Sequence, residues 1–185
     1  MSKKIYLASK SPRRQELLTL MGFKYELLLK DVDESYPNSL ALKDVAVYIS
    51  KAKADAFDAP TDGIIITSDT VVILGDELLG KPKDAEDAYA MLKRLNNQTH
   101  EVITGVTLKN EQKCFTFSEK TEVTFSNLSD EQIWYYINNF HPFDKAGSYG
   151  IQDWIGMIGV KSINGSYTNV MGLPTERLYK EIIQF

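Results

Sequence analysis

One acidic residue interrupts the most apolar segment of this 185-residue chain. Residues 63–74 are rich in β-branched side chains, which is typical of a buried strand, yet Asp69 lies in the middle, within Ser68-Asp69-Thr70. A carboxylate there loses its hydration at a large free-energy cost unless it is paired, binds a metal or faces a cleft. Asp69 is therefore either a structural residue bonded to backbone or to a nearby lysine, or a functional group that binds a divalent cation or accepts a proton from water.

Helices and strands intermix on both sides of this strand. Ser11 caps a helix that starts at Pro12, and Ser129-Asp130-Glu131-Gln132 is a capping box that opens another helix. We expect helices over residues 12–21, 41–57, 84–95, 129–140 and 174–185, and strands over residues 4–8, 23–29, 63–74, 100–109, 114–125 and 155–163. Strands and helices do not strictly alternate along the chain, so we expect an α/β fold with a mixed sheet flanked by helices. No linker or repeat marks a boundary, which favours one domain over residues 1–185.

Composition narrows the functional classes. The chain is 43% hydrophobic and 25% charged, as expected for a globular protein, and its net charge of −4 argues against a general nucleic-acid surface. The single cysteine, Cys114, cannot form a disulfide within the chain, which favours a reducing compartment. The apolar run at residues 5–8 is too short for an export signal, and no later stretch approaches a membrane span. Any polyanion must then be held by a few placed cations.

The clearest group of placed cations is Ser9-Lys10-Ser11-Pro12-Arg13-Arg14. A helix begins at Pro12, and the positive end of its dipole favours acidic residues in the first turn, whereas this helix has two arginines. An anion bound to the free N–H groups would explain Arg13 and Arg14. The alternative is that both arginines are solvated surface residues and Ser11 is only a cap. Ligands of open α/β folds bind at the carboxyl ends of strands, which favours the anion site.

Weaker signals are spread along the chain. They comprise Lys51 and Lys53 in the second helix, Lys81 in Gly80-Lys81-Pro82, the acidic cluster Asp31, Asp33 and Glu34, and the loop from Lys145 to Gln152. Each charge alone is more often a solvated surface residue than a ligand, and the loop alone is more often an ordinary turn. Phosphate-loop and dinucleotide-binding motifs are missing from the sequence, and His100 and His141 lack metal-ligand spacing.

Taken in order, these segments resemble the Maf family of septum-formation inhibitor proteins and nucleotide pyrophosphatases. The matching segments are Leu7-Ala8-Ser9-x-Ser11-Pro12-Arg13-Arg14, Lys51-Ala52-Lys53-Ala54, Ser68-Asp69-Thr70-Val71-Val72, Gly80-Lys81-Pro82, Thr104-Gly105-Val106, Asp144-Lys145-Ala146-Gly147-Ser148-Tyr149-Gly150-Ile151-Gln152 and Val170-Met171-Gly172-Leu173-Pro174. The resemblance implies an elongated α/β fold similar to inosine triphosphatases, with two lobes around a cleft. It also implies a divalent cation cofactor (Mg²⁺ or Mn²⁺), a cytoplasmic location, a nucleoside triphosphate as partner, no nucleic acid or membrane partner, and a homodimer.

The resemblance further implies a role for individual residues. Asp69 falls on the catalytic acidic position, described as the proton acceptor. Substrate choice falls on Arg13, Thr70 and Gln152. Phosphate binding falls on Ser9, Arg14, Lys51 and Lys81, and metal binding on Asp33 and Asp69. Two positions depart from the family pattern, because Ser68 stands where Ala is common and Asp33 where Glu is common.

This pattern looks like the branch that hydrolyses dTTP and UTP to the monophosphate and pyrophosphate, with modified pyrimidine nucleotides as further candidates and a role in restraining septum formation. The expected mechanism binds the triphosphate at the helix that starts at Pro12, and a water activated by the cation attacks the α-phosphorus. One alternative is the branch acting on 7-methyl-GTP, which differs around Arg13 and Gln152. The other is a non-catalytic nucleotide sensor that regulates cell division, although a sensor has no need for Asp69 beside the phosphates.

Overall fold

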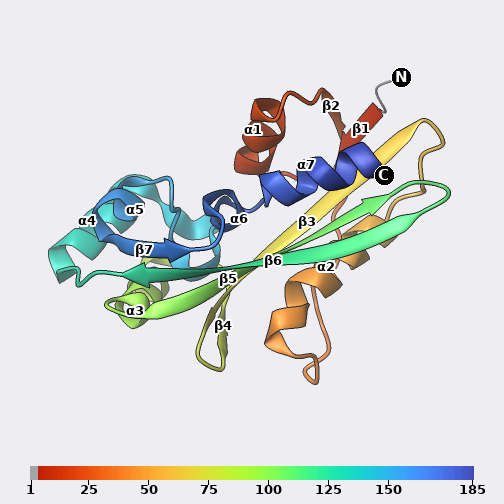
Figure 1. The fold of residues 1–185 in the computed structure, drawn as a ribbon. Helices are drawn as coiled ribbons and strands as arrows, with labels where there is room; N and C mark the ends of the chain where they lie inside the picture. Colours follow the sequence, from red (N-terminus) through yellow and green to blue (C-terminus); the bar gives the residue numbers. More distant parts are fainter. Residues whose placement is uncertain (1–3) are drawn as a thin grey trace. The chain divides into compact units, whose positions relative to one another are not determined.

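A computed structural model of the chain describes residues 4–185 (Figure 1). Its helices are α1 (Pro12–Leu20), α2 (Val45–Asp55), α3 (Ala85–Leu95), α4 (Asp130–Phe140), α5 (Trp154–Gly159), α6 (Tyr167–Met171) and α7 (Thr175–Gln184). Its strands are β1 (Lys4–Leu7), β2 (Tyr25–Leu27), β3 (Gly63–Leu74), β4 (Glu77–Leu79), β5 (Thr99–Lys109), β6 (Cys114–Phe125) and β7 (Val160–Asn164). Among these described helices, none is long and apolar enough to span a membrane.

The strands form one mixed sheet with the order β2-β1-β3-β5-β6-β7, and β4 pairs with β3 off this path. β1 is parallel to both of its neighbours, with Leu7 opposite Leu27 and Ile66. β4 is antiparallel to β3, and β7 is antiparallel to β6. The α/β class with a mixed sheet and flanking helices is therefore confirmed. β3 runs without a break through Asp69, so the carboxylate is part of the strand and not of a loop between two strands.

The chain forms two compact units. Unit 1 comprises the segment up to Thr70 together with Thr104–Glu119 and Gly172–Phe185. Its core contains fully buried side chains from β1, α1 and β3, such as Leu7, Leu18 and Ile66. Helix α2 closes on β5 where Gly105 leaves room, because a Cβ atom at Gly105 would lie 2.3 Å from the carbonyl oxygen of Ala46. That close approach fixes α2 and the residues it carries.

Unit 2 comprises Val71–Ile103 and Lys120–Met171. Its core is one cluster that includes Leu92 from α3, Phe125 from β6 and Tyr136 from α4. The rings of Phe125 and Tyr149 meet at 4.9 Å between centroids, which adds an aromatic contact to the burial of apolar area. Tyr149 belongs to the loop that leads to Gln152, so this core holds the loop in place.

Caps mark several helix starts as the sequence predicts. Ser129 and Gln132 form the expected capping box, and the side chain of Asp84 accepts from the backbone N–H of Asp87. The predicted strand over residues 155–163 is wrong in its first half, where α5 forms after Asp153 and only Val160–Asn164 is a strand. Gly156 permits this turn because a Cβ atom there would lie 1.9 Å from the carbonyl oxygen of Ile151.

Candidate active site

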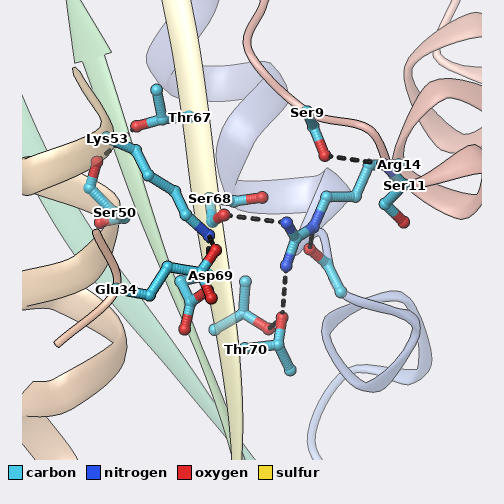
Figure 2. A network of polar contacts seen from close by, with 12 residues as sticks. Ser9, Ser11, Arg14, Glu34, Ser50, Lys53, Thr67, Ser68, Asp69 and Thr70 are labelled. Atoms are coloured by element: carbon cyan, nitrogen blue, oxygen red, sulfur yellow. Dashed lines mark hydrogen bonds and ion pairs between the residues drawn. The ribbon is translucent and has the colours of Figure 1, made fainter. Parts of the chain in front are cut away.

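Asp69 forms an ion pair with Lys53 of α2 (Figure 2). The Lys53 Nζ atom lies 2.8 Å from Oδ1 of Asp69 and 2.7 Å from Oε1 of Glu34. The side chains of Lys53 and Asp69 are only 15% and 13% exposed. A partly buried ammonium shared by two carboxylates offsets the desolvation that a lone Asp69 would suffer. Within residues 4–185, Oδ2 of Asp69 accepts no hydrogen bond, so one oxygen remains for a ligand or a proton.

Lys51 and Lys53 point in different directions because side chains two residues apart on a helix are separated by about 200° around the helix axis. The Lys51 ammonium instead lies 2.6 Å from Oδ2 of Asp55 one turn further along α2, where both side chains are more than half exposed. A hydrogen bond from this ammonium to Asp55 raises the pKa of Lys51. The structure thus brings Lys53 to Asp69 and leaves Lys51, the lysine with the predicted phosphate role, in a surface ion pair.

Buried hydroxyl groups fix α2 against β3 beside this pair. Thr67 donates to the carbonyl oxygen of Ser50 at 2.6 Å, and the hydroxyls of Ser50 and Thr107 lie 3.1 Å apart. Thr67 and Asp69 are two residues apart on a strand, so both side chains face α2. The hydrogen bond of Thr67 therefore fixes the position of α2 along β3. At this position Lys53, one turn after Ser50, contacts Asp69.

The side chain of Arg14 lies on the face of β3 opposite to Asp69 and is held there by hydrogen bonds. Its Nη1 donates to the carbonyl oxygen of Ser68 at 2.8 Å, its Nη2 to the hydroxyl of Thr70 at 3.0 Å, and its Nε to the carbonyl oxygen of Gly172 at 2.8 Å. Burial lowers the pKa of Arg14, and the Asp69 carboxylate opposes that shift. One N–H bond on Nη1 and one on Nη2 remain for an anion. Arg14, which is predicted to bind phosphate, thus also forms hydrogen bonds to the residues on either side of Asp69.

Thr70, predicted to influence substrate choice, is part of the same hydrogen-bonded network (Figure 2). Its hydroxyl accepts from Arg14 and lies 2.9 Å from the hydroxyl of Thr104 on β5, which is fully buried. Thr70 therefore links Arg14 to the next strand of the sheet, and its hydroxyl is engaged by the protein on two sides.

The start of α1 is arranged as an anion site would require. Ser9 is buried, and its hydroxyl accepts from the backbone N–H of Ser11 at 3.2 Å. Ser11 precedes the helix with extended backbone, but its side chain makes no capping hydrogen bond. The predicted N-terminus at Pro12 is confirmed, and the first turn holds no acidic residue. Arg13 is partly buried in that turn. The N–H groups here have the polarity that attracts an anion.

The two acidic neighbours before α2 differ in what they contact. Asp33 is exposed, and its carboxylate accepts from the backbone N–H and the hydroxyl of Ser35, both at 2.9 Å, which lowers the pKa of Asp33. Glu34 instead reaches Lys53. Glu34 is therefore the second carboxylate beside Asp69, and Asp33, predicted as a metal ligand, is engaged within its own loop. Across residues 4–185, no three His, Cys, Asp or Glu side chains gather to hold a metal by themselves.

Lys81 and Gln152 belong to unit 2. Lys81 is exposed after β4, and the preceding carbonyl oxygen, of Gly80, accepts from the N–H of Gly147 at 3.0 Å. This bond ties the Lys81 turn to the loop that carries Gln152. The Gln152 side chain donates from Nε2 to Oδ1 of Asp153 at 3.1 Å, and no pattern in the sequence predicts this contact.

The groups around Asp69 suit chemistry at a phosphate better than covalent catalysis. Asp69 can accept a proton through Oδ2 while Lys53 holds Oδ1, and the N-terminus of α1 and the guanidinium of Arg14 supply positive potential. Phosphoryl transfer needs mainly positioning and charge stabilisation of this kind.

Comparison with known proteins adds four findings. The family model described as Maf-like protein matches residues 4–185. A Flavobacterium psychrophilum protein named dTTP/UTP pyrophosphatase is 53% identical over 178 residues, which cover 95% of this chain and 91% of that protein. A Phocaeicola vulgatus protein of the same name is 52% identical over 182 residues, which cover 97% and 94%. The solved Staphylococcus aureus Ham1 protein has a TM-score of 0.52 at 16% identity, covers 97% of this chain and 100% of its own, and shares the fold.

Proposed function

This chain belongs to the Maf family, and from that premise we propose that it is a nucleoside triphosphate pyrophosphatase that hydrolyses dTTP and UTP to the monophosphate and pyrophosphate. The observation that carries the mechanism is the ion pair between Lys53 of α2 and Asp69 in the middle of β3. A free oxygen on a fixed carboxylate is what a general base for water requires.

In the proposed reaction, the oxygen of a water molecule attacks the α-phosphorus and the bond from that phosphorus to the bridging oxygen breaks. Pyrophosphate leaves with the bonding electrons, and Oδ2 of Asp69 takes the proton of the attacking water. Lys53 holds Asp69 oriented before attack through its hydrogen bond to Oδ1. Arg14 holds Ser68 and Thr70, which fixes the backbone around Asp69. The carboxylate is then preorganised and does not need to reorient during the reaction.

Phosphate binding is proposed for Ser9 and Arg14, beside the N-terminus of α1. Lys51 and Lys81 keep this role from the family resemblance, and contact with Asp69 supports Lys53 as a further cation of the site. Arg13, Thr70 and Gln152 are proposed to set substrate choice. The hydroxyl of Thr70 is already bonded to Arg14 and Thr104, so Thr70 would act by shaping the site and not by a free hydroxyl.

The proposed cofactor is a divalent cation, Mg²⁺ or Mn²⁺. The donor set fits, because Asp69 and Glu34 supply two carboxylates and Mg²⁺ is usually held by one or two carboxylates together with substrate phosphates and water. Asp33 could join only by releasing Ser35. When bound, the cation would neutralise developing charge on the phosphates and lower the pKa of coordinated water.

A panel of pyrophosphate-release assays tests this function. The purified chain is incubated with UTP, dTTP, CTP and GTP in the presence of Mg²⁺, Mn²⁺ or EDTA. We expect release from UTP and dTTP that EDTA abolishes. Binding of these nucleotides without release would instead identify a nucleotide sensor, and a preference for 7-methyl-GTP would place the chain in the other branch.

A further inference from the structure

A directed chain of hydrogen bonds runs through unit 2 to Asp153. The backbone N–H of Gly150 donates to the hydroxyl oxygen of Tyr136 at 3.0 Å. Tyr136, fully buried on α4, then donates its own hydrogen to Oδ2 of Asp153 at 2.7 Å. A backbone N–H can only donate, so the Tyr136 hydroxyl hydrogen is free to point at the carboxylate. Asp153 is thereby anchored as an acceptor at the start of α5.

The second oxygen of Asp153 determines how the amide of Gln152 is oriented. Oδ1 of Asp153 accepts from Nε2 of Gln152 at 3.1 Å. An ionised carboxylate offers only acceptors, so the amide nitrogen must face it and the amide oxygen must face away. That oxygen, Oε1 of Gln152, is buried and has no hydrogen-bond partner among residues 4–185. An unpaired buried acceptor favours a ligand that brings a donor.

Gly150 is required for this arrangement. A Cβ atom at Gly150 would lie 2.4 Å from Oδ2 of Asp153 and 2.7 Å from Nε2 of Gln152. The two side chains therefore pack directly on the backbone of the loop. Lys145 lies 3.8 Å from Oδ2 of Asp153 and 2.7 Å from Asp144, so it adds positive charge beside the carboxylate.

We propose that Asp153 is a positioning residue for base selection: it holds Gln152 so that Oε1, an acceptor, is the atom offered to the base. Uracil and thymine carry a donor at N3, whereas cytosine carries an acceptor there. This inference rests on the proposed hydrolysis of dTTP and UTP and on the proposed role of Gln152. Oε1 is buried and without a partner among residues 4–185, and the N3–H group of uracil or thymine would supply the donor that it lacks.

The proposal explains how a glutamine can discriminate at all. A free glutamine amide can rotate to present either its oxygen or its NH₂ group, and so could accept uracil or cytosine equally. With Asp153 in place, rotation would set Oε1 of Gln152 against Oδ1 of Asp153, two acceptors facing each other. Two acceptors that face each other in a buried site raise the free energy of binding cytosine. We expect this to lower kcat/KM for the cytosine nucleotide by about tenfold or more relative to the uracil nucleotide.

The test is Asp153→Asn, since an asparagine amide can donate to Gln152 as well as accept from it. We expect the ratio of kcat/KM for UTP to kcat/KM for CTP to fall about tenfold, with a smaller change in the UTP value itself. Asp144→Asn is the matched control, because Asp144 shares Lys145 with Asp153 and is expected to leave the ratio within about twofold. Both variants are first compared with wild type by melting temperature.

A double-mutant cycle separates base selection from a merely structural role. In a Gln152→Met background there is no amide to orient, so Asp153→Asn should no longer alter the UTP-to-CTP ratio. An unchanged ratio in the single variant, or the same change in both backgrounds, would overturn the proposal.

Calorimetric binding of UMP and CMP, which carry the base but no pyrophosphate to release, keeps this test independent of turnover. Tighter UMP binding that weakens in Asp153→Asn supports the proposal even if the wild type releases no pyrophosphate, in which case only the proposed function fails. Equal binding of UMP and CMP by an active wild-type enzyme would overturn the role of Asp153 and leave the function standing.

Discussion

Lys53 on α2 places its ammonium nitrogen 2.8 Å from Oδ1 of Asp69 in the middle of β3. This pair explains how an apolar strand accommodates a carboxylate. It also identifies which of two neighbouring lysines serves the candidate site, because Lys51 pairs with Asp55 on the exposed face of the same helix.

Replacing each lysine in turn tests that assignment. Lys53→Met should lower kcat/KM for UTP by about 100-fold and cost about 1–3 kcal/mol of unfolding free energy, because Asp69 loses its partner in a partly buried place. Lys51→Met removes an exposed pair and should change stability by less than about 0.5 kcal/mol. If Lys51→Met caused the larger loss of activity, the phosphate role predicted for Lys51 would stand and the role of Lys53 would be structural.

Asp69→Asn should fold normally and lose nearly all pyrophosphate release, because an amide cannot accept the proton of water. Its melting temperature should stay within a few degrees of wild type, since the Asn oxygen can still accept from Lys53 and Glu34 still balances the ammonium. Asp55→Asn is the control, as its carboxylate is half exposed and pairs with Lys51. Turnover by Asp69→Asn close to that of wild type would remove Asp69 from the mechanism.

Ser68→Ala should stabilise the chain. The Ser68 hydroxyl is buried and has no hydrogen-bond partner among residues 4–185. Removing an unsatisfied buried hydroxyl is expected to raise the unfolding free energy by about 1 kcal/mol. Activity should not change, because Arg14 holds Ser68 through its carbonyl oxygen. Urea unfolding of both proteins measures the difference, and a decrease in stability would reveal a hydroxyl contact that this arrangement lacks.

The sequence predicts those parts of the fold that depend on local chemistry. The capping residues Asp84 and Ser129 mark helix starts correctly, and the cost of burying a carboxylate draws attention to Asp69 before any contact is known. The strand predicted over residues 155–163 fails because its apolar residues suit a buried helical turn as well as a strand. Gly156 decides the matter by allowing a contact with the carbonyl of Ile151.

The contacts between side chains are harder to predict. Lys53 lies one helical turn after Ile49 and continues the buried stripe of α2, a signal that could have separated it from Lys51. Asp33 and Glu34 lie in a loop without periodicity, so nothing local indicates which of them reaches Lys53. The bond between Gln152 and Asp153 depends on Tyr136, far away in sequence.

Arg14 variants separate charge from geometry. Arg14→Lys keeps the positive charge but cannot bond Ser68, Thr70 and Gly172 together as the guanidinium does. We expect kcat to fall about 100-fold in both Arg14→Lys and Arg14→Ala, by a similar factor for UTP, dTTP and GTP, because the role carries no base information. Recovery by lysine would show that charge on the phosphates matters more than the hold on β3. A change in base preference would instead show that Arg14 acts on substrate choice through Thr70.

His100 should make the folded chain sensitive to mild acid. The ring is buried, its Nε2 lies 2.7 Å from the Tyr149 hydroxyl, and Nδ1 has no partner among residues 4–185. Burial lowers the pKa of His100 from 6.5 to about 4. Between these values the unfolded chain binds a proton that the folded chain does not, so stability falls as pH decreases through this window and levels off below it. The loss attributable to His100 is on the order of 3 kcal/mol.

His100→Gln keeps a polar side chain for Tyr149 but does not titrate, so its urea midpoint should depend less on pH between 4 and 6.5. Equal pH dependence in both proteins would show that other groups govern acid unfolding.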